Sequence, residues 1–143
     1  EPWRGGLRVI FDENYQHSIA RVLAPWADMD GHIVTSVRQL GLDSTKDVDL
    51  FQMIADPNIK TVLITADKAM SRRQHEIAAI RETGSVVVLS TKAWNQQSDT
   101  VQRTRMMVWW WPTILHCSKE ADHGSFLELP WANTVKTLRR WRA

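Results

Sequence analysis

The 143-residue chain has the size of one ordinary domain and is long enough to bury a core of its own. Its 43 % hydrophobic and 24 % charged residues exclude a chain that is disordered throughout, and its net charge of +2 excludes binding to nucleic acid through bulk charge alone. The single cysteine, Cys117, excludes an internal disulfide framework and predicts a reducing, cytoplasmic location, and no apolar run approaches the roughly 20 residues that span a membrane.

The first two thirds of the chain alternate between strand-like and helix-like segments. Continuous apolar runs predict four strands, the first of them buried on both faces, at 7–11, 32–37, 61–65 and 85–90. Strands that alternate with helices indicate βαβ units and a parallel sheet. We therefore expect one domain, with a βαβ core over 7–94 and a C-terminal part over 95–143.

Helical spacing of apolar residues fills the gaps between these strands. A helix is expected after Asn14 and should end early at Pro25, and a short helix is expected over 48–55. A third helix should run from a capping box at Ser71–Gln74 to a C-cap at Gly84.

The last third of the chain differs in character. Asp99 is an N-cap candidate for a long helix that reaches about Glu120, and Pro112 should kink or split this helix. A short edge strand is expected over 126–129, followed by a basic helix over 134–141.

Acidic side chains follow the ends of two predicted strands. Asp12 and Glu13 come directly after the first strand, and Asp67 comes just after the third. Asp47, with Asp49 close by, opens the helix that precedes the third strand. Because the first and third strands can be neighbours in a doubly wound sheet, we expect these acids to meet at the carboxyl edge of the sheet.

A cluster of carboxylates needs a divalent cation or a proton to neutralise it. Oxygen ligands without histidine or cysteine favour Mg²⁺ or Mn²⁺ over zinc, and a carboxylate-bound Mg²⁺ can activate water and stabilise a phosphodiester transition state. We therefore predict Asp12, Asp47 and Asp67 as catalytic metal ligands, with Glu13 as a further metal contact. Two of them have a second interpretation, because Asp47 could equally be a helix N-cap and Asp67 the cap of the turn that follows it.

Three short segments of the chain together resemble the motifs of a known family. Phe11-Asp12-Glu13-Asn14, Asp47-Val48-Asp49-Leu50-Phe51 and Leu63-Ile64-Thr65-Ala66-Asp67-Lys68 are similar to those of PIN-like domains, in particular the compact ones allied to VapC toxins of toxin–antitoxin systems. The resemblance covers about residues 7–94, and the run Trp110-Trp111-Pro112 resembles the tail of that subgroup.

The resemblance implies a Mg²⁺- or Mn²⁺-dependent endoribonuclease on a three-layer α/β/α sandwich with a mainly parallel central sheet. It also implies an RNA substrate and a cognate antitoxin protein as partner. Asp12, Asp47 and Asp67 match the acidic positions of the family, and Thr65 matches the hydroxyl beside the last acid. PIN domains usually present four acids, and here the fourth is open between Glu13 and Asp49.

Basic residues lie close to the predicted acids. Lys68, Arg72 and Arg73 follow Asp67 closely, and we predict that they contact phosphate groups of RNA, although solvated cations at a helix start would have the same pattern. The basic end of the chain, at 139–142, could bind RNA or an acidic partner, or be a solvated face, which is commoner.

Tryptophan is unusually frequent, with eight residues. Adjacent Trp109, Trp110 and Trp111 would point in three directions from a helix, so we expect that they cannot all face one core and that at least one contacts an antitoxin or a second copy of the chain. Stacking on RNA bases is the less favoured alternative.

Two other functions fit parts of the same pattern. A receiver-like phosphoacceptor domain would use Asp12, Glu13, Asp67 and Ser90, but it also needs a lysine at the end of a fifth parallel strand. A degenerate PIN-like binding module would explain the missing fourth acid. The histidines lack metal-ligand spacing, and no glycine-rich phosphate loop is present, which argues against an NTPase or a dinucleotide site.

Overall fold

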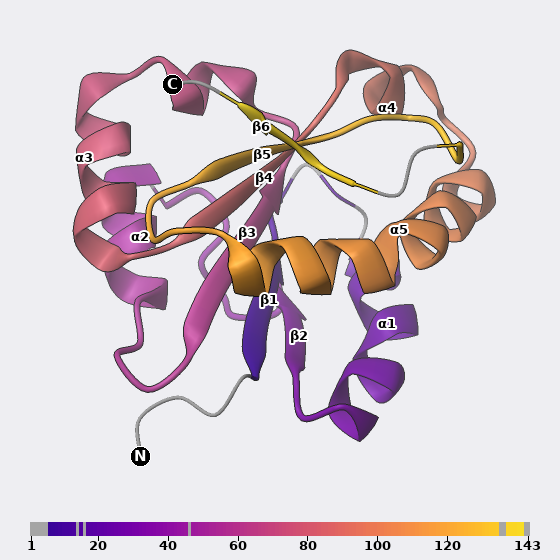
Figure 1. Ribbon diagram of the computed structural model, residues 1–143, viewed down its shortest axis with the longest axis horizontal. Helices are drawn as coiled ribbons and strands as arrows, with labels where there is room; N and C mark the ends of the chain where they lie inside the picture. The colour runs from indigo at the N-terminus through magenta and orange to yellow at the C-terminus, as the bar shows by residue number, and fades with distance from the viewer. Residues whose placement is uncertain (1–5, 14, 16, 46, 135–136, 142–143) are drawn as a thin grey trace.

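The computed structural model describes residues 6–13, 15, 17–45, 47–134 and 137–141, and it leaves the side chains of Asp47, Val48 and Trp141 undescribed. A six-stranded sheet crosses the molecule, with helices packed on both of its faces (Figure 1). No helix in the described part of the chain is long and apolar enough to cross a membrane.

The strands form one sheet in the order β2-β1-β3-β4-β5-β6. Strands β1 to β5 are parallel to their neighbours, and β6 runs antiparallel to β5 at the edge. In chain order the strands are β1 Leu7–Phe11, β2 Ile33–Ser36, β3 Lys60–Thr65, β4 Val86–Ser90, β5 Phe126–Leu129 and β6 Arg139–Trp141.

Helices connect the strands and cover the sheet. In chain order they are α1 His17–Met29, α2 Asp47–Ile54, the 3₁₀ helix η1 Lys68–Ser71, α3 Gln74–Thr83, α4 Lys92–Gln96 and α5 Thr100–Glu120.

Alternation along the buried strands gives the sheet two apolar faces. Val9 and Phe11 of β1 pack with residues of α1 and α5, whereas Ile10 packs with residues of α2 and α3 (Figure 1). Side chains of successive strand residues point to opposite faces, so a strand buried on both sides must be apolar throughout. The predicted three-layer α/β/α sandwich with a mainly parallel sheet is therefore confirmed.

The two helices that contain a proline both continue through it. Helix α1 continues through Pro25 to Met29, and α5 continues through Pro112 as one helix, so the expected early end and the expected split are wrong. Proline removes one backbone donor and leaves a carbonyl one turn earlier without its partner. Pro25 and Arg21 are both exposed, so water can bond to the carbonyl that Pro25 leaves unpaired.

Two other predicted elements are wrong. Ser71 does not open a helix, because it ends η1 and its hydroxyl donates to the Lys68 carbonyl, while α3 begins later at Gln74. The expected basic C-terminal helix is replaced, over 139–141, by strand β6, which makes β5 an internal strand. In this pairing Arg139 lies opposite Glu128, and opposite charges across a strand pair favour the register.

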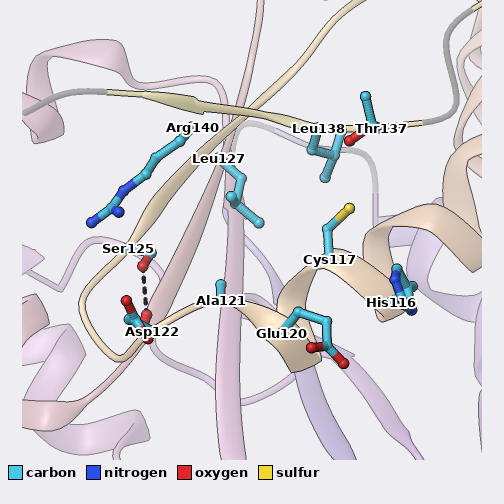
Figure 2. A pocket seen from close by; sticks show the side chains of 10 residues that line it. All are labelled: His116, Cys117, Glu120, Ala121, Asp122, Ser125, Leu127, Thr137, Leu138 and Arg140. Atoms are coloured by element: carbon cyan, nitrogen blue, oxygen red, sulfur yellow. Dashed lines mark hydrogen bonds between the residues drawn. The ribbon is translucent and has the colours of Figure 1, made fainter.

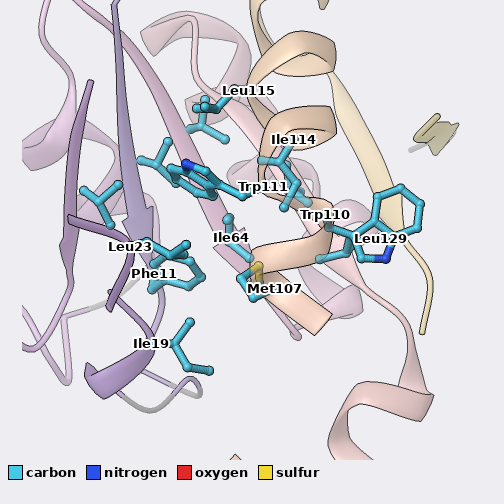
Figure 3. Close-up of a cluster of buried hydrophobic side chains, with 14 of the residues drawn as sticks. Phe11, Ile19, Leu23, Ile64, Met107, Trp110, Trp111, Ile114, Leu115 and Leu129 are labelled. Carbon is cyan, nitrogen blue, oxygen red and sulfur yellow. The ribbon is translucent and has the colours of Figure 1, made fainter. Parts of the chain in front are cut away.

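The adjacent tryptophans of α5 share one core, contrary to expectation. Trp110 and Trp111 are buried in the same apolar cluster (Figure 3). Half-buried Trp109 packs against this cluster, with its ring centroid 5.0 Å from that of Trp110. Trp110 also donates from Nε1 to the Ala132 carbonyl at 2.8 Å. The segment after β5 therefore covers α5 on a side that the sequence reading left exposed.

Candidate functional site at the carboxyl end of the sheet

The candidate site lies where the order of the strands reverses. Strand β1 has β2 on one side and β3 on the other, so the chain departs from β1 in opposite directions. In open α/β sheets, ligands bind in the crevice at this switch point, outside the carboxyl ends of the strands. Asp12 directly follows β1 at this point, and its backbone N–H is held by the Ile64 carbonyl of β3 at 2.9 Å.

Asp12 is a buried carboxylate, with 7 % of its surface exposed. Its Oδ2 accepts a hydrogen bond from Thr65 Oγ1 at 2.6 Å, and its Oδ1 accepts one from the Glu13 N–H at 2.9 Å. Burial raises the pKa of Asp12, the two hydrogen bonds act against this, and the negative charges of Glu13 and Asp67 raise it further. The fold thus buries this carboxylate beside two other acids, which cannot compensate its negative charge.

Asp67 is joined to Asp12 through Thr65. The Thr65 hydroxyl donates to Asp12 and accepts from the Asp67 N–H at 3.1 Å, and Thr65 is fully buried. The Asp67 side chain also accepts from the Ala69 N–H at 3.1 Å, so it caps η1. Its other oxygen lies 3.6 Å from Arg73 Nη1. Asp67 therefore caps the turn, as the second interpretation of this residue proposed, and also lies beside Asp12.

Glu13 bonds to the loop that precedes α2. Its Oε2 accepts a hydrogen bond from the Ser44 N–H at 3.0 Å. This contact ties the start of α2, where Asp47 lies, to the end of β1. The side chain of Asp47 lies outside the described residues, and Asp49 is exposed on α2. The ligand roles of Glu13, Asp47 and Asp49 therefore stay predictions.

The basic residues predicted to bind substrate lie around the same edge. Arg73 Nη1 is 2.9 Å from Glu76 Oε1 as well as near Asp67, and Lys68 Nζ lies 3.8 Å from Glu128 Oε2. Arg72 is exposed. Contacts of Lys68, Arg72 and Arg73 with RNA stay predictions, and Arg73 already partly neutralises Asp67.

The carboxylates of the candidate site fit a hard cation that takes only one or two of its ligands from the protein. Within the described ranges, no group of three or more His, Cys, Asp or Glu side chains is placed to hold a metal. Mg²⁺ is commonly bound through only one or two carboxylates, with water and substrate phosphates as the remaining ligands. Asp12 and Asp67 supply two carboxylates, so they suit Mg²⁺ or Mn²⁺ better than a fully protein-bound ion.

Two buried residues beside these acids, Tyr15 and Arg103, were missed in the sequence. Tyr15 follows Asp12 in a turn, closed by a hydrogen bond from the Tyr15 N–H to the Asp12 carbonyl at 3.0 Å. Burial raises the pKa of Tyr15 to about 12, while the Ser90 side chain and the charge of Arg103 act in the opposite direction. Arg103 lies on α5 with its Cζ 5.1 Å from the Tyr15 ring centroid.

One sequence signal could have identified Arg103. It lies four residues before Met107, on the side of α5 that packs into the core. A charged residue at helical spacing with core residues is unusual, because arginine is almost never fully buried without a partner. Tyr15 carries no such signal, since tyrosine is common in cores.

A further cavity lies away from these residues. It has a volume of about 320 Å³ and is formed by the end of α5, including His116 and Glu120, together with Leu127 of β5 and Arg140 of β6 (Figure 2). None of the residues predicted from the sequence to carry the chemistry lines it.

Comparison with known proteins gives one match. A family model described as a PIN like domain matches residues 7–92, which is more than half of the chain. The matched range contains Asp12, Thr65, Asp67 and Ser90, and it ends before α5 and Arg103. Searches of curated proteins and of solved structures return no match.

Proposed function

Because the chain belongs to the family of PIN-like domains, whose members are typically nucleases that use divalent metals, we propose that it is a Mg²⁺- or Mn²⁺-dependent endoribonuclease. The observation that carries the proposal is the Asp12–Thr65–Asp67 chain at the switch point of the sheet. It joins the Asp12 carboxylate to the backbone of Asp67, and the charge of Asp67 raises the pKa of Asp12, so a cation between the two acids would relieve their repulsion.

In this mechanism Asp12 and Asp67 would hold the cation, and Asp47 and Glu13 are the proposed additional acids. The metal, when bound, would lower the pKa of a water molecule and stabilise the charge that develops on the phosphate. Thr65 is a positioning residue, because its hydroxyl fixes Asp12 Oδ2 and its Oγ1 accepts from the Asp67 N–H. Lys68 directly follows Asp67, Arg72 follows the end of η1, and both are proposed to bind the phosphates on either side of the bond that is cleaved.

Cleavage of a single-stranded RNA in the presence of Mg²⁺ or Mn²⁺ tests this function. We expect cleavage that chelation abolishes and that falls by at least about 100-fold in Asp12→Asn and Asp67→Asn, since each variant removes a proposed metal ligand. Asp28→Asn is the matched control, because Asp28 is exposed on α1 and takes no part in the proposed site. Undiminished cleavage by the Asp12→Asn protein would reject the mechanism, and the absence of metal binding would favour the degenerate binding module.

We propose further that the nuclease acts as the toxin of a toxin–antitoxin pair. The support is the likeness of the Phe11–Asn14, Asp47–Phe51 and Leu63–Lys68 segments to PIN-like proteins allied to VapC toxins. Induced expression in a bacterial host should arrest growth, and the protein encoded beside it should relieve the arrest when co-expressed. Equal arrest by wild type and Asp12→Asn would show that any toxicity is unrelated to cleavage.

The receiver-like alternative has less support. Its lysine would have to follow the fifth parallel strand, and β5 ends at Leu129, which is followed by Pro130 and Trp131. The family match is to PIN-like domains.

A further inference from the structure

Two side chains that contact Tyr15 bury nitrogens that have no hydrogen-bond partner. Trp94 packs edge-on to Tyr15 with ring centroids 6.4 Å apart, and the Arg103 guanidinium lies over the Tyr15 ring at 5.1 Å. Tyr15 is 4 % exposed, Trp94 0 % and Arg103 7 %. Within the described chain, three buried nitrogens of these side chains lack a partner: Trp94 Nε1, and Arg103 Nε and Nη2.

All three atoms are indole or guanidinium nitrogens that can only donate a hydrogen bond, so what they lack is an acceptor. A buried donor without a partner costs free energy, and the cost is greater when the group is charged. The aromatic face of Tyr15 offsets only part of this for Arg103, since a cation–π contact satisfies none of its N–H groups. An acceptor with negative charge would satisfy the set.

This cluster adjoins the acidic site. The Asp12 carbonyl accepts from the Tyr15 N–H, so the turn after β1 connects the two sites directly. Ser90, at the end of β4, donates from Oγ at 3.4 Å to the carbonyl of Thr65, the residue whose hydroxyl bonds to Asp12. At the carboxyl ends of β1, β3 and β4, the acids Asp12 and Asp67 thus lie close to the donors of Trp94 and Arg103 that lack a partner.

We propose that Tyr15, Trp94 and Arg103 form a subsite that binds a phosphate group of the RNA strand beside the acids that cleave it. The identity of the strand rests on the proposed function, whereas the phosphate chemistry rests on the donors themselves. Phosphate offers several acceptor oxygens with full charge, and a guanidinium is its best-matched partner because its N–H groups form a fork. With Arg103 largely shielded from water, such bonds are at their strongest.

The site also separates charge in a useful way. The guanidinium of Arg103 would compensate the charge of a phosphate bound there, so this charge would add less to the repulsion among the acids. RNA carries a phosphate at every nucleotide. One phosphate would therefore lie at the acids, and its neighbour along the strand would contact the donors of the subsite. The arrangement would fix the register of the strand relative to the acids.

Binding without cleavage tests the subsite. RNA affinity is measured by fluorescence polarisation with a short single-stranded oligonucleotide in the presence of a chelator, so that cleavage cannot contribute. We expect Arg103→Met to weaken binding roughly 10- to 100-fold, because it removes charge-assisted hydrogen bonds. Arg105→Met is the matched control, since Arg105 is exposed two residues further along the same helix.

A second readout needs no RNA. Inorganic phosphate or pyrophosphate, added at constant ionic strength, should raise the Tm of the wild type and of Arg105→Met but leave that of Arg103→Met unchanged. Equal shifts in all three proteins, together with equal RNA affinities, would overturn the proposal and leave the donors to ordered water. If Arg103→Met does not fold, Tyr15→Phe removes only the hydroxyl, and Arg103→Lys keeps the charge without the fork; unchanged phosphate and RNA binding in both would also overturn it.

The source of the phosphate is distinguished by the end of the oligonucleotide. An internal phosphodiester should bind equally well with a 5′-phosphate or a 5′-hydroxyl end, and this is the result that the proposal expects. Binding that requires the 5′-phosphate would overturn the internal position and assign the subsite to a strand terminus. These binding results are independent of catalysis, so a protein that binds phosphate through Arg103 but never cleaves RNA would refute the proposed function and not the subsite.

Discussion

The two ends of the sheet both bury ionisable groups, but they surround them differently. At the amino end, His32 Nδ1 accepts from the Leu7 N–H at 2.9 Å, and Lys60 Nζ donates to the last carbonyls of α5, those of Lys119 and Ala121. At the carboxyl end, Asp12 has hydrogen bonds but is surrounded by other acids, and Arg103 is buried with unpaired nitrogens. Polar side chains at the amino end form hydrogen bonds with backbone groups that would otherwise lack a partner. Those at the carboxyl end leave charge that a ligand can compensate.

This contrast separates stability from function along the strands. Substitutions at the amino end should change the free energy of unfolding and spare cleavage. Substitutions at the carboxyl end should reduce cleavage and have little effect on folding, or even stabilise the protein. Four variants, taken from the largest expected effect to the smallest, test this difference.

Thr65→Val should have the largest effect. It removes the hydroxyl that donates to Asp12 and accepts from the Asp67 N–H, so both proposed ligands lose their fixed orientation. We expect cleavage to fall about 10- to 100-fold, as for other groups that orient metal ligands. Thr65→Ser keeps the hydroxyl and should retain most of the activity. Equal losses in the two variants, measured as initial rates, would mean that the methyl group and not the hydroxyl matters.

Lys60→Met should lower the free energy of unfolding by about 1.5–3 kcal/mol, the range for hydrogen bonds to charged groups. Lys60 is 9 % exposed, and its ammonium group closes the C-terminus of α5, where positive charge also favours the helix dipole. Denaturant unfolding measures the change, with Lys119→Met as the control because that side chain is exposed on the same helix. Cleavage should be unchanged, and a loss of cleavage in folded protein would contradict the division between the two ends.

His32 should make stability depend on pH in the mildly acidic range. Burial lowers the pKa of His32, as does the positive charge of Lys119, so the unfolded chain binds the proton more tightly than the folded one. Its contribution is therefore complete above the ordinary histidine pKa of about 6.5 and is lost as the pH falls below that value. The Tm of wild type should decrease between about pH 7 and 5 more steeply than that of His32→Gln, whereas His75→Gln, at an exposed position, should follow wild type.

Asp12→Asn should have the smallest effect. In the absence of metal it should slightly stabilise the protein, whereas Lys60→Met destabilises it. Burial and neighbouring acids raise the pKa of Asp12, so the folded chain binds its proton more tightly than the unfolded chain. Stability from this group is greatest below the ordinary value and is lost as the pH rises through the raised pKa, so ionised Asp12 is unfavourable at neutral pH. Asparagine removes that charge, and we expect a slightly higher Tm, by a few degrees at most. A markedly lower Tm would show that Asp12 supports the fold.

The sequence indicates local features better than features that depend on contacts made far along the chain. The four apolar runs place β1, β2, β3 and β4 to within a residue or two, because each run is buried by its own composition. The Gly84 C-cap is also confirmed, since its φ of 74° is a conformation that favours glycine. The acids after β1 and β3 lie side by side because a parallel sheet brings the carboxyl ends of its strands together.

The errors arise where tertiary contacts decide. Strand β6 depends on its pairing with β5, which local spacing over 134–141 does not reveal. Helix α1 tolerates Pro25 because the affected carbonyl is exposed, which is a property of packing. Arg103 was overlooked because its burial depends on α5 lying over Tyr15, a residue 88 positions earlier in the chain by their numbers.

The most direct test of the account is a calorimetric titration of Mn²⁺ into the metal-free wild type and into Asp12→Asn. We expect Mn²⁺ to bind the wild type. Asp12→Asn should abolish this binding or weaken it by at least about tenfold, as expected for a lost metal ligand. Asp28→Asn should bind as the wild type does, because Asp28 is exposed on α1. Equal binding by Asp12→Asn and wild type would contradict the assignment of the carboxyl end of the sheet as the metal site.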